Sequence, residues 1–210
     1  MDRLEEEISP FVEEAAYHEA GHAVVAFLIT DAKFKSIKID AIEKYGVVNL
    51  DDGSKLGKVS RKKKKANTNI NIPEITNEII ILCSGDVAEF LFTGIRGGHD
   101  GVDNANSFKL LSRVCPEEII PDYIEDIWNI ALTLLEQPPN WFAVEQLAQS
   151  LQVGYTELQD WNGDELAYDC DYIEENRELD GDQVRKIIIE AFELYAKLKK
   201  RKKVYYREPK

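Results

Sequence analysis

Residues 16–26 read Ala-Tyr-His-Glu-Ala-Gly-His-Ala-Val-Val-Ala, an apolar stretch that contains the pattern H-E-x-x-H. Two positions four residues apart on a helix differ by about 40° around its axis, so His18 and His22 face one side and can bind one metal ion. Glu19 follows the first histidine and can reach a water bound to that metal. This is the layout of a zinc hydrolase, provided that the chain supplies a third ligand.

The composition predicts a single domain over residues 1–210, with 44% hydrophobic residues. The formal net charge of -13 argues against nucleic acid as a partner. Three cysteines without a CxxC pair fit a reducing compartment. The chain shows no signal core, and no apolar run reaches the roughly 18 to 20 residues of a membrane span. We therefore expect a cytoplasmic protein without a transmembrane segment.

The apolar periodicity predicts a mainly α-helical bundle with one small β-sheet or hairpin next to the active-site helix. Ser9 as N-cap and Pro10 as the first helical residue begin that helix, which should run to about residue 29. Residues 34–50 roughly alternate apolar and polar side chains, which indicates two short strands. We expect further helices at about residues 74–92, 104–114, 117–136, 141–151 and 182–200.

Three polar segments are expected outside this helical core. They are a basic loop at about residues 51–72, an acidic insertion at about 153–178 and a basic C-terminal tail at about 199–210. Each is interpreted as a solvated loop or tail, with attachment to an anionic membrane surface or an acidic partner as the alternative. Gly94 is expected to end one helix, and Asp182 to cap the last one.

A catalytic zinc ion takes three protein ligands and a water, and the spacing of residues leaves the third ligand open. The one remaining histidine, His99, is a candidate. The other candidates are carboxylates, namely Asp86, Glu89, Asp100 and Asp103.

Residues 16–26 resemble the active-site helix of the FtsH family, which consists of membrane-anchored, ATP-dependent zinc metalloproteases with an AAA ATPase module and a helical peptidase domain. A second family segment has a small-residue turn, an Ala-Glu pair, a Gly, and a loop ending in an Asp that opens a helix. Residues 85–94, the following loop and Asp103 are similar to it. A weaker similarity joins residues 141–151 and 179–184 to the family's last two helices.

The resemblance implies an FtsH-type peptidase domain in which Asp103 is the third zinc ligand beside His18 and His22. His99 remains the rival third ligand, because residues 96–99 replace the family's Thr-Thr-Gly loop. The same comparison places Val102 where the family usually has Asn.

Glu89 is expected to orient one of the histidines rather than to bind zinc. Glu19 is expected to be the catalytic residue: it takes a proton from zinc-bound water, whose pKa falls from about 15.7 to about 7, and delivers it to the leaving amine. The edge strand within residues 34–50 can pair with an extended substrate backbone.

These features predict a zinc-dependent metalloendopeptidase that hydrolyses unfolded or small polypeptides. The phosphate-binding pattern G-x-x-x-x-G-K-[ST] does not occur, since the nearest stretch, residues 53–58, has only three residues between its glycines. Any ATP-driven unfolding is therefore expected from an associated AAA ATPase, and family relatives suggest a homo-oligomer. The alternative function is a catalytically weak or inactive zinc-binding adaptor or regulator of an AAA protease.

Overall fold

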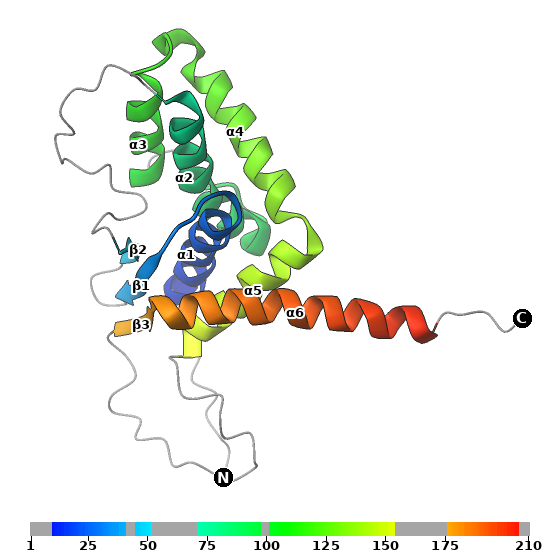
Figure 1. Cartoon of the computed structure of the whole chain (residues 1–210). Coiled ribbons are helices and arrows are strands. Elements are labelled where there is room, and N and C mark those ends of the chain that lie inside the picture. Colours follow the sequence, from blue (N-terminus) through cyan, green and yellow to red (C-terminus); the bar gives the residue numbers. More distant parts are fainter. Residues whose placement is uncertain (1–9, 41–44, 52–70, 98–100, 154–175, 206–210) are drawn as a thin grey trace, which may run out of the picture.

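A computed structural model describes residues 10–40, 45–51, 71–97, 101–153 and 176–205. The elements in chain order are α1 (Pro10–Ile29), β1 (Phe34–Asp40), β2 (Tyr45–Leu50), α2 (Ile72–Thr93), α3 (Val102–Leu111), the short 3-10 helix η1 (Glu117–Ile119), α4 (Ile120–Leu135), α5 (Pro138–Val153), β3 (Asn176–Asp180) and α6 (Gly181–Tyr205). The expected mainly helical fold with one small sheet is confirmed (Figure 1). Within the described segments, no helix has the length and apolar character needed to cross a membrane.

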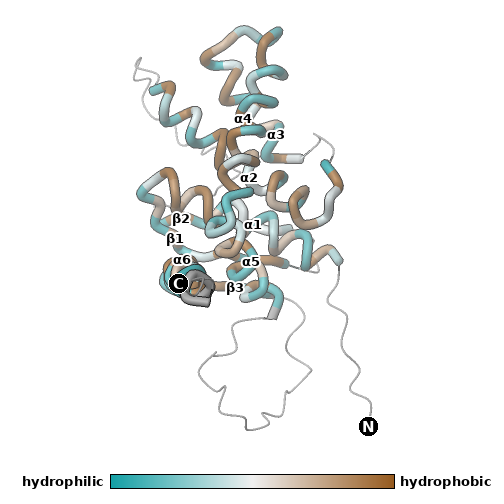
Figure 2. Tube along the Cα trace, turned by 90° about the vertical axis from the view of Figure 1, so that its right-hand side faces the viewer, coloured by the Kyte–Doolittle hydropathy of each residue, from teal (hydrophilic) through white to brown (hydrophobic). Residues whose placement is uncertain are grey.

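The helix α1 is the centre of the fold. It lies between α2, α5 and the sheet in two perpendicular views (Figure 1, Figure 2). Its small residues allow close packing, because a Cβ atom at Gly21 would lie 2.5 Å from the Ala88 Cβ and 2.5 Å from the Ser84 carbonyl oxygen of α2. Glycine at this crossing therefore brings the H-E-x-x-H segment directly against α2.

The sheet is antiparallel, with the strand order β2-β1-β3. The predicted pair of strands is confirmed as β1 and β2, in which Ile37 lies opposite Val48. The predicted loop through residue 178 is wrong at its end, because residues 176–178 belong to β3 and pair with β1. The sequence of β3 has a single apolar residue, Leu179, so its own pattern gives no strand signal.

The C-terminal end of α2 was predicted correctly, whereas the first residue of α6 was not. Gly94 ends α2 as expected, with a φ of 72° and its N–H donating to the Phe90 carbonyl oxygen at 2.8 Å. The prediction of Asp182 as the cap of α6 is wrong. The backbone N–H of Gln183 donates to Asp180 Oδ1 at 2.8 Å, and the Asp180 N–H donates to Gln183 Oε1 at 2.9 Å. This reciprocal capping box begins the helix two residues earlier.

Replacing Asp180 with Ala is expected to lower the free energy of unfolding by about 1 kcal/mol, because α6 loses the side chain that caps its first turn. Urea denaturation measures the change. The matched control is Asp182→Ala in the same turn, for which we expect a few tenths of a kcal/mol through the helix dipole. Equal effects of the two variants would contradict the capping assignment.

The remaining helix limits shift by a few residues from those predicted. The helix α3 begins at Val102 and ends at Leu111, and α6 continues to Tyr205, so the segment expected as a tail from residue 199 begins as helix. Most of the expected basic loop (52–70) and acidic insertion (154–175) lies outside the described residues, as does the predicted N-cap Ser9.

Candidate metal centre

Three donor atoms from two helices converge on one point. The Nε2 atoms of His18 and His22 lie 3.0 Å apart, and Asp103 Oδ2 lies 3.2 Å from the first and 3.1 Å from the second. Zinc bonds of about 2.0–2.1 Å in a tetrahedron would place ligand atoms roughly 3.3 Å from one another. The spacing of the three atoms therefore fits one zinc ion.

The contacts of the two Nδ1 atoms indicate which ring nitrogen of each histidine carries the lone pair. His22 Nδ1 donates to the Ile81 carbonyl oxygen at 2.6 Å, and His18 Nδ1 lies 3.3 Å from Glu89 Oε2. A neutral imidazole that donates through Nδ1 carries its lone pair on Nε2. With both histidines in this neutral tautomer, two imidazole lone pairs and a carboxylate oxygen meet at one point, and such a donor set suits a cation.

The pKa values of the same groups indicate the same demand for positive charge. Burial disfavours a charged His18, but hydrogen bonds to Asp103 and Glu89 outweigh it and raise the pKa of His18 well above 6.5. Burial likewise disfavours an ionised Asp103, but the charge of His22 and the hydrogen bonds from both imidazoles hold its pKa well below the usual value. In the absence of a metal, protons on the histidines would supply the missing positive charge.

The stability of metal-free protein is therefore expected to fall as the pH rises from 6 to 9. A raised histidine pKa contributes stability that is complete below the unfolded value of 6.5 and is lost as the pH rises through the folded value. Melting temperatures of chelator-treated protein measure this decline, and His18→Gln should flatten it. A melting temperature that is constant or rises over this range would contradict the assignment.

A glycine of α2 closes one side of the centre. A Cβ atom at Gly85 would lie 2.5 Å from His22 Nε2 and 2.7 Å from His18 Nε2, so the α2 backbone rests against both imidazoles. Any larger residue would occupy the space of the ligand atoms.

Replacing Gly85 with Ala is expected to weaken zinc binding at least tenfold. Alanine favours a helix over glycine by about 1 kcal/mol, so a loss of zinc would come from the steric contact and not from the helix. Competition with a chromophoric chelator measures the affinity. The control is Gly97→Ala, where an added Cβ would meet no atom within 4 Å. Unchanged zinc affinity in the Gly85 variant would refute this packing.

Glu19 lies outside the three-atom cluster but next to it, and its side chain is buried. An added Cβ at Gly46 of β2 would lie 2.6 Å from Glu19 Cγ, so the edge strand β2 passes directly beside this carboxylate. Burial raises the pKa of Glu19, while the charges of His22 and His18 partly oppose the shift. A carboxylate with a raised pKa is better suited to exchange protons near neutral pH.

The structure brings four residues that the sequence singled out into one centre: His18, Glu19, His22 and Asp103. Glu89 lies at the Nδ1 side of His18, with its Oε2 atom 3.3 Å from that nitrogen. The rival ligand His99 and the candidate Asp100 lie outside the described residues.

Asp86, a candidate third ligand, lies at the Nδ1 side of His18, at 3.6 Å. Sequence reasoning missed two parts of this centre. The Ile81 carbonyl oxygen carries no sequence signal, since every residue has one. Gly46 interrupts the alternation of the strands, and that interruption was its only signal.

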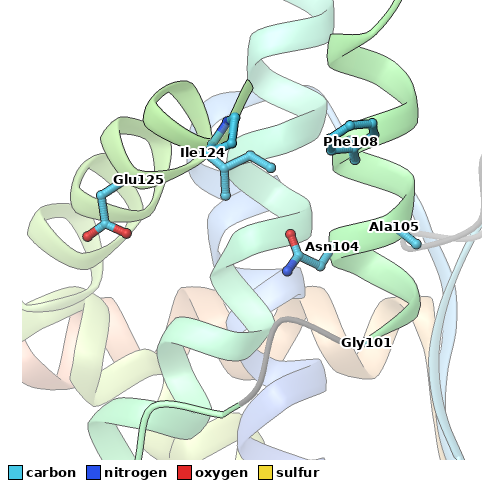
Figure 3. Close-up of a pocket in the computed structure, with 7 residues that line it drawn as sticks. Gly101, Asn104, Ala105, Phe108, Ile124 and Glu125 are labelled. Carbon is cyan, nitrogen blue, oxygen red and sulfur yellow. The ribbon is translucent and has the colours of Figure 1, made fainter. Parts of the chain in front are cut away.

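A pocket of about 530 Å³ lies between α3 and α4 (Figure 3). It is lined by Gly101, Asn104, Ala105, Phe108, Pro121, Ile124 and Glu125. Helical geometry places Ala105 and Phe108 roughly 200° and 140° around α3 from Asp103, so the pocket is on the far face of this helix from the histidines. It is separate from the metal centre.

No protein-family model matches the chain, and no curated protein matches it. The interpretation of the centre therefore rests on its geometry and its chemistry.

Proposed function

We propose that this protein is a zinc-dependent metalloendopeptidase that hydrolyses peptide bonds in unfolded or small polypeptides. The observation that carries the proposal is the convergence of His18 Nε2, His22 Nε2 and Asp103 Oδ2 beside the buried Glu19 carboxylate. The resemblance of residues 16–26 and 85–103 to the FtsH peptidase domain supports the same reaction.

Different residues of the chain would bind the metal, orient a ligand and transfer protons. The two histidines and Asp103 would hold the zinc ion, which would act as a Lewis acid toward the substrate carbonyl and lower the pKa of the attacking water. Glu89 fixes the ring of His18 through Nδ1. Glu19 accepts a proton from water on its carboxylate and passes it to the amine that leaves.

The edge strand β2 supplies a place for the substrate. Among the described residues it pairs with β1 alone, and Gly46 brings it against Glu19. An extended peptide that adds to this edge forms backbone hydrogen bonds and passes the catalytic carboxylate. Backbone recognition of this kind tolerates many substrate sequences, which suits an enzyme for unfolded chains.

We also infer a cytoplasmic location and an ATPase partner for folded substrates. Cys83 and Cys115 are free thiols, as a reducing compartment would leave them. Without such a partner, the protein is expected to cleave an unfolded chain and to leave the same protein intact when it is folded.

Removal and return of zinc test the proposed function. Chelator-treated protein should lose cleavage of a permanently unfolded polypeptide, and one equivalent of zinc should restore it. Undiminished cleavage by metal-free protein would refute a zinc enzyme. Tight zinc binding without turnover of any unfolded substrate would favour the adaptor or regulator instead.

A further inference from the structure

Asp86 lies next to the metal centre, but its carboxylate is not one of the three converging donor groups. It lies three residues before Glu89 on α2, and both side chains point at His18 Nδ1, at 3.6 Å and 3.3 Å. This nitrogen carries one proton, and only Glu89 is within hydrogen-bond distance of it. Asp86 therefore keeps its acceptor oxygens available.

The Asp86 side chain is 33% exposed, so a ligand at the protein surface can reach it. In the part of the chain that the structure describes, the ion pairs of Asp86 and Glu89 are with His18, and neither carboxylate has a Lys or Arg partner. Glu19 and Asp103 add two more carboxylates to the same centre. The four carboxyl groups outnumber the two positive charges of one zinc ion, which favours a cationic ligand at this place.

We propose that Asp86 makes the peptidase selective for substrates with a Lys or Arg side chain next to the scissile bond. This inference rests on the proposed function, since it names the substrate class of the same site. A long cationic side chain reaches the free oxygens of Asp86 while the backbone stays near His18. An acidic side chain in the same place is repelled, so the site discriminates by attraction and by repulsion.

Capped peptides that differ in one residue beside the cleaved bond test this selectivity. With Lys, Met or Glu at that position and N-acetylated, C-amidated ends, we expect kcat/KM about fivefold higher for Lys than for Met, and lowest for Glu. High salt should narrow the differences. Asp86→Asn should bring the Lys-to-Met ratio close to one, and Asp86→Glu should keep the preference. Asp122→Asn, an exposed acidic residue of α4, is the control and should leave the ratio unchanged.

A fourth peptide and a binding measurement separate the possible results. The fourth peptide is the Met peptide with a free N-terminus. If its kcat/KM exceeds that of the capped Met peptide by a larger factor than the Lys peptide's does, the recognised cation is an α-amino group, and the Lys/Arg selectivity is overturned. Equal cleavage of Lys, Met and Glu peptides overturns the selectivity and leaves the peptidase intact. Fluorescence anisotropy with the zinc-loaded Glu19→Gln variant measures binding without turnover. Preferred binding of the Lys peptide there, with no cleavage by wild type, supports the cation site and refutes the peptidase.

Discussion

Replacing Glu19 with Gln is expected to abolish peptide hydrolysis while zinc affinity stays within about twofold of the wild type. The carboxylate lies beside the three converging donor atoms and is not one of them, so the metal keeps its ligands. The amide has nearly the same shape but cannot accept a proton from water. Loss of general base catalysis lowers kcat by about 10²- to 10⁴-fold.

Metal analysis and initial rates on an unfolded polypeptide measure the two effects on the same sample. The matched control is Glu14→Gln on α1, because Glu14 is exposed and carries the same change of charge. We expect its rate and zinc content to equal those of the wild type. A Glu19→Gln variant that cleaves as fast as wild type would refute the proposed mechanism.

Replacing Asp103 with Asn is expected to weaken zinc binding by on the order of a hundredfold or more. The substitution removes the charged oxygen that lies 3.1 Å from His22 Nε2 and 3.2 Å from His18 Nε2. A neutral amide oxygen is a poorer zinc ligand than a carboxylate, and even residues behind the ligands change metal affinity by about 10- to 100-fold. Competition titration with a chelator of known affinity measures the loss.

The comparison with His99→Ala decides the identity of the third ligand. We expect this variant to bind zinc like the wild type, because Asp103 already completes the set of three. The reverse result, with zinc lost in His99→Ala and kept in Asp103→Asn, would assign the third position to His99. A double variant that loses no further affinity beyond Asp103→Asn would agree with our assignment.

The sequence predicted the features that depend on residues close to one another along the chain. The positions of His18 and His22 on one face of a helix follow from the helical repeat alone. The end of α2 at Gly94 follows from the conformational freedom of glycine in the left-handed region. The strand β3 escaped prediction because hydrogen bonds to β1, and not its own apolar pattern, make it a strand.

By itself, the sequence determined that this protein has a paired-histidine helix with a glutamate beside it in a mainly helical fold. Only the tertiary structure brought Asp103 to that helix, across 81 residues from His22. It also placed Gly46 against Glu19 and a free carboxylate, Asp86, beside His18. The physical reason is that helix periodicity acts over a few residues, whereas the packing of α1, α2 and α3 decides which distant side chains share one metal centre.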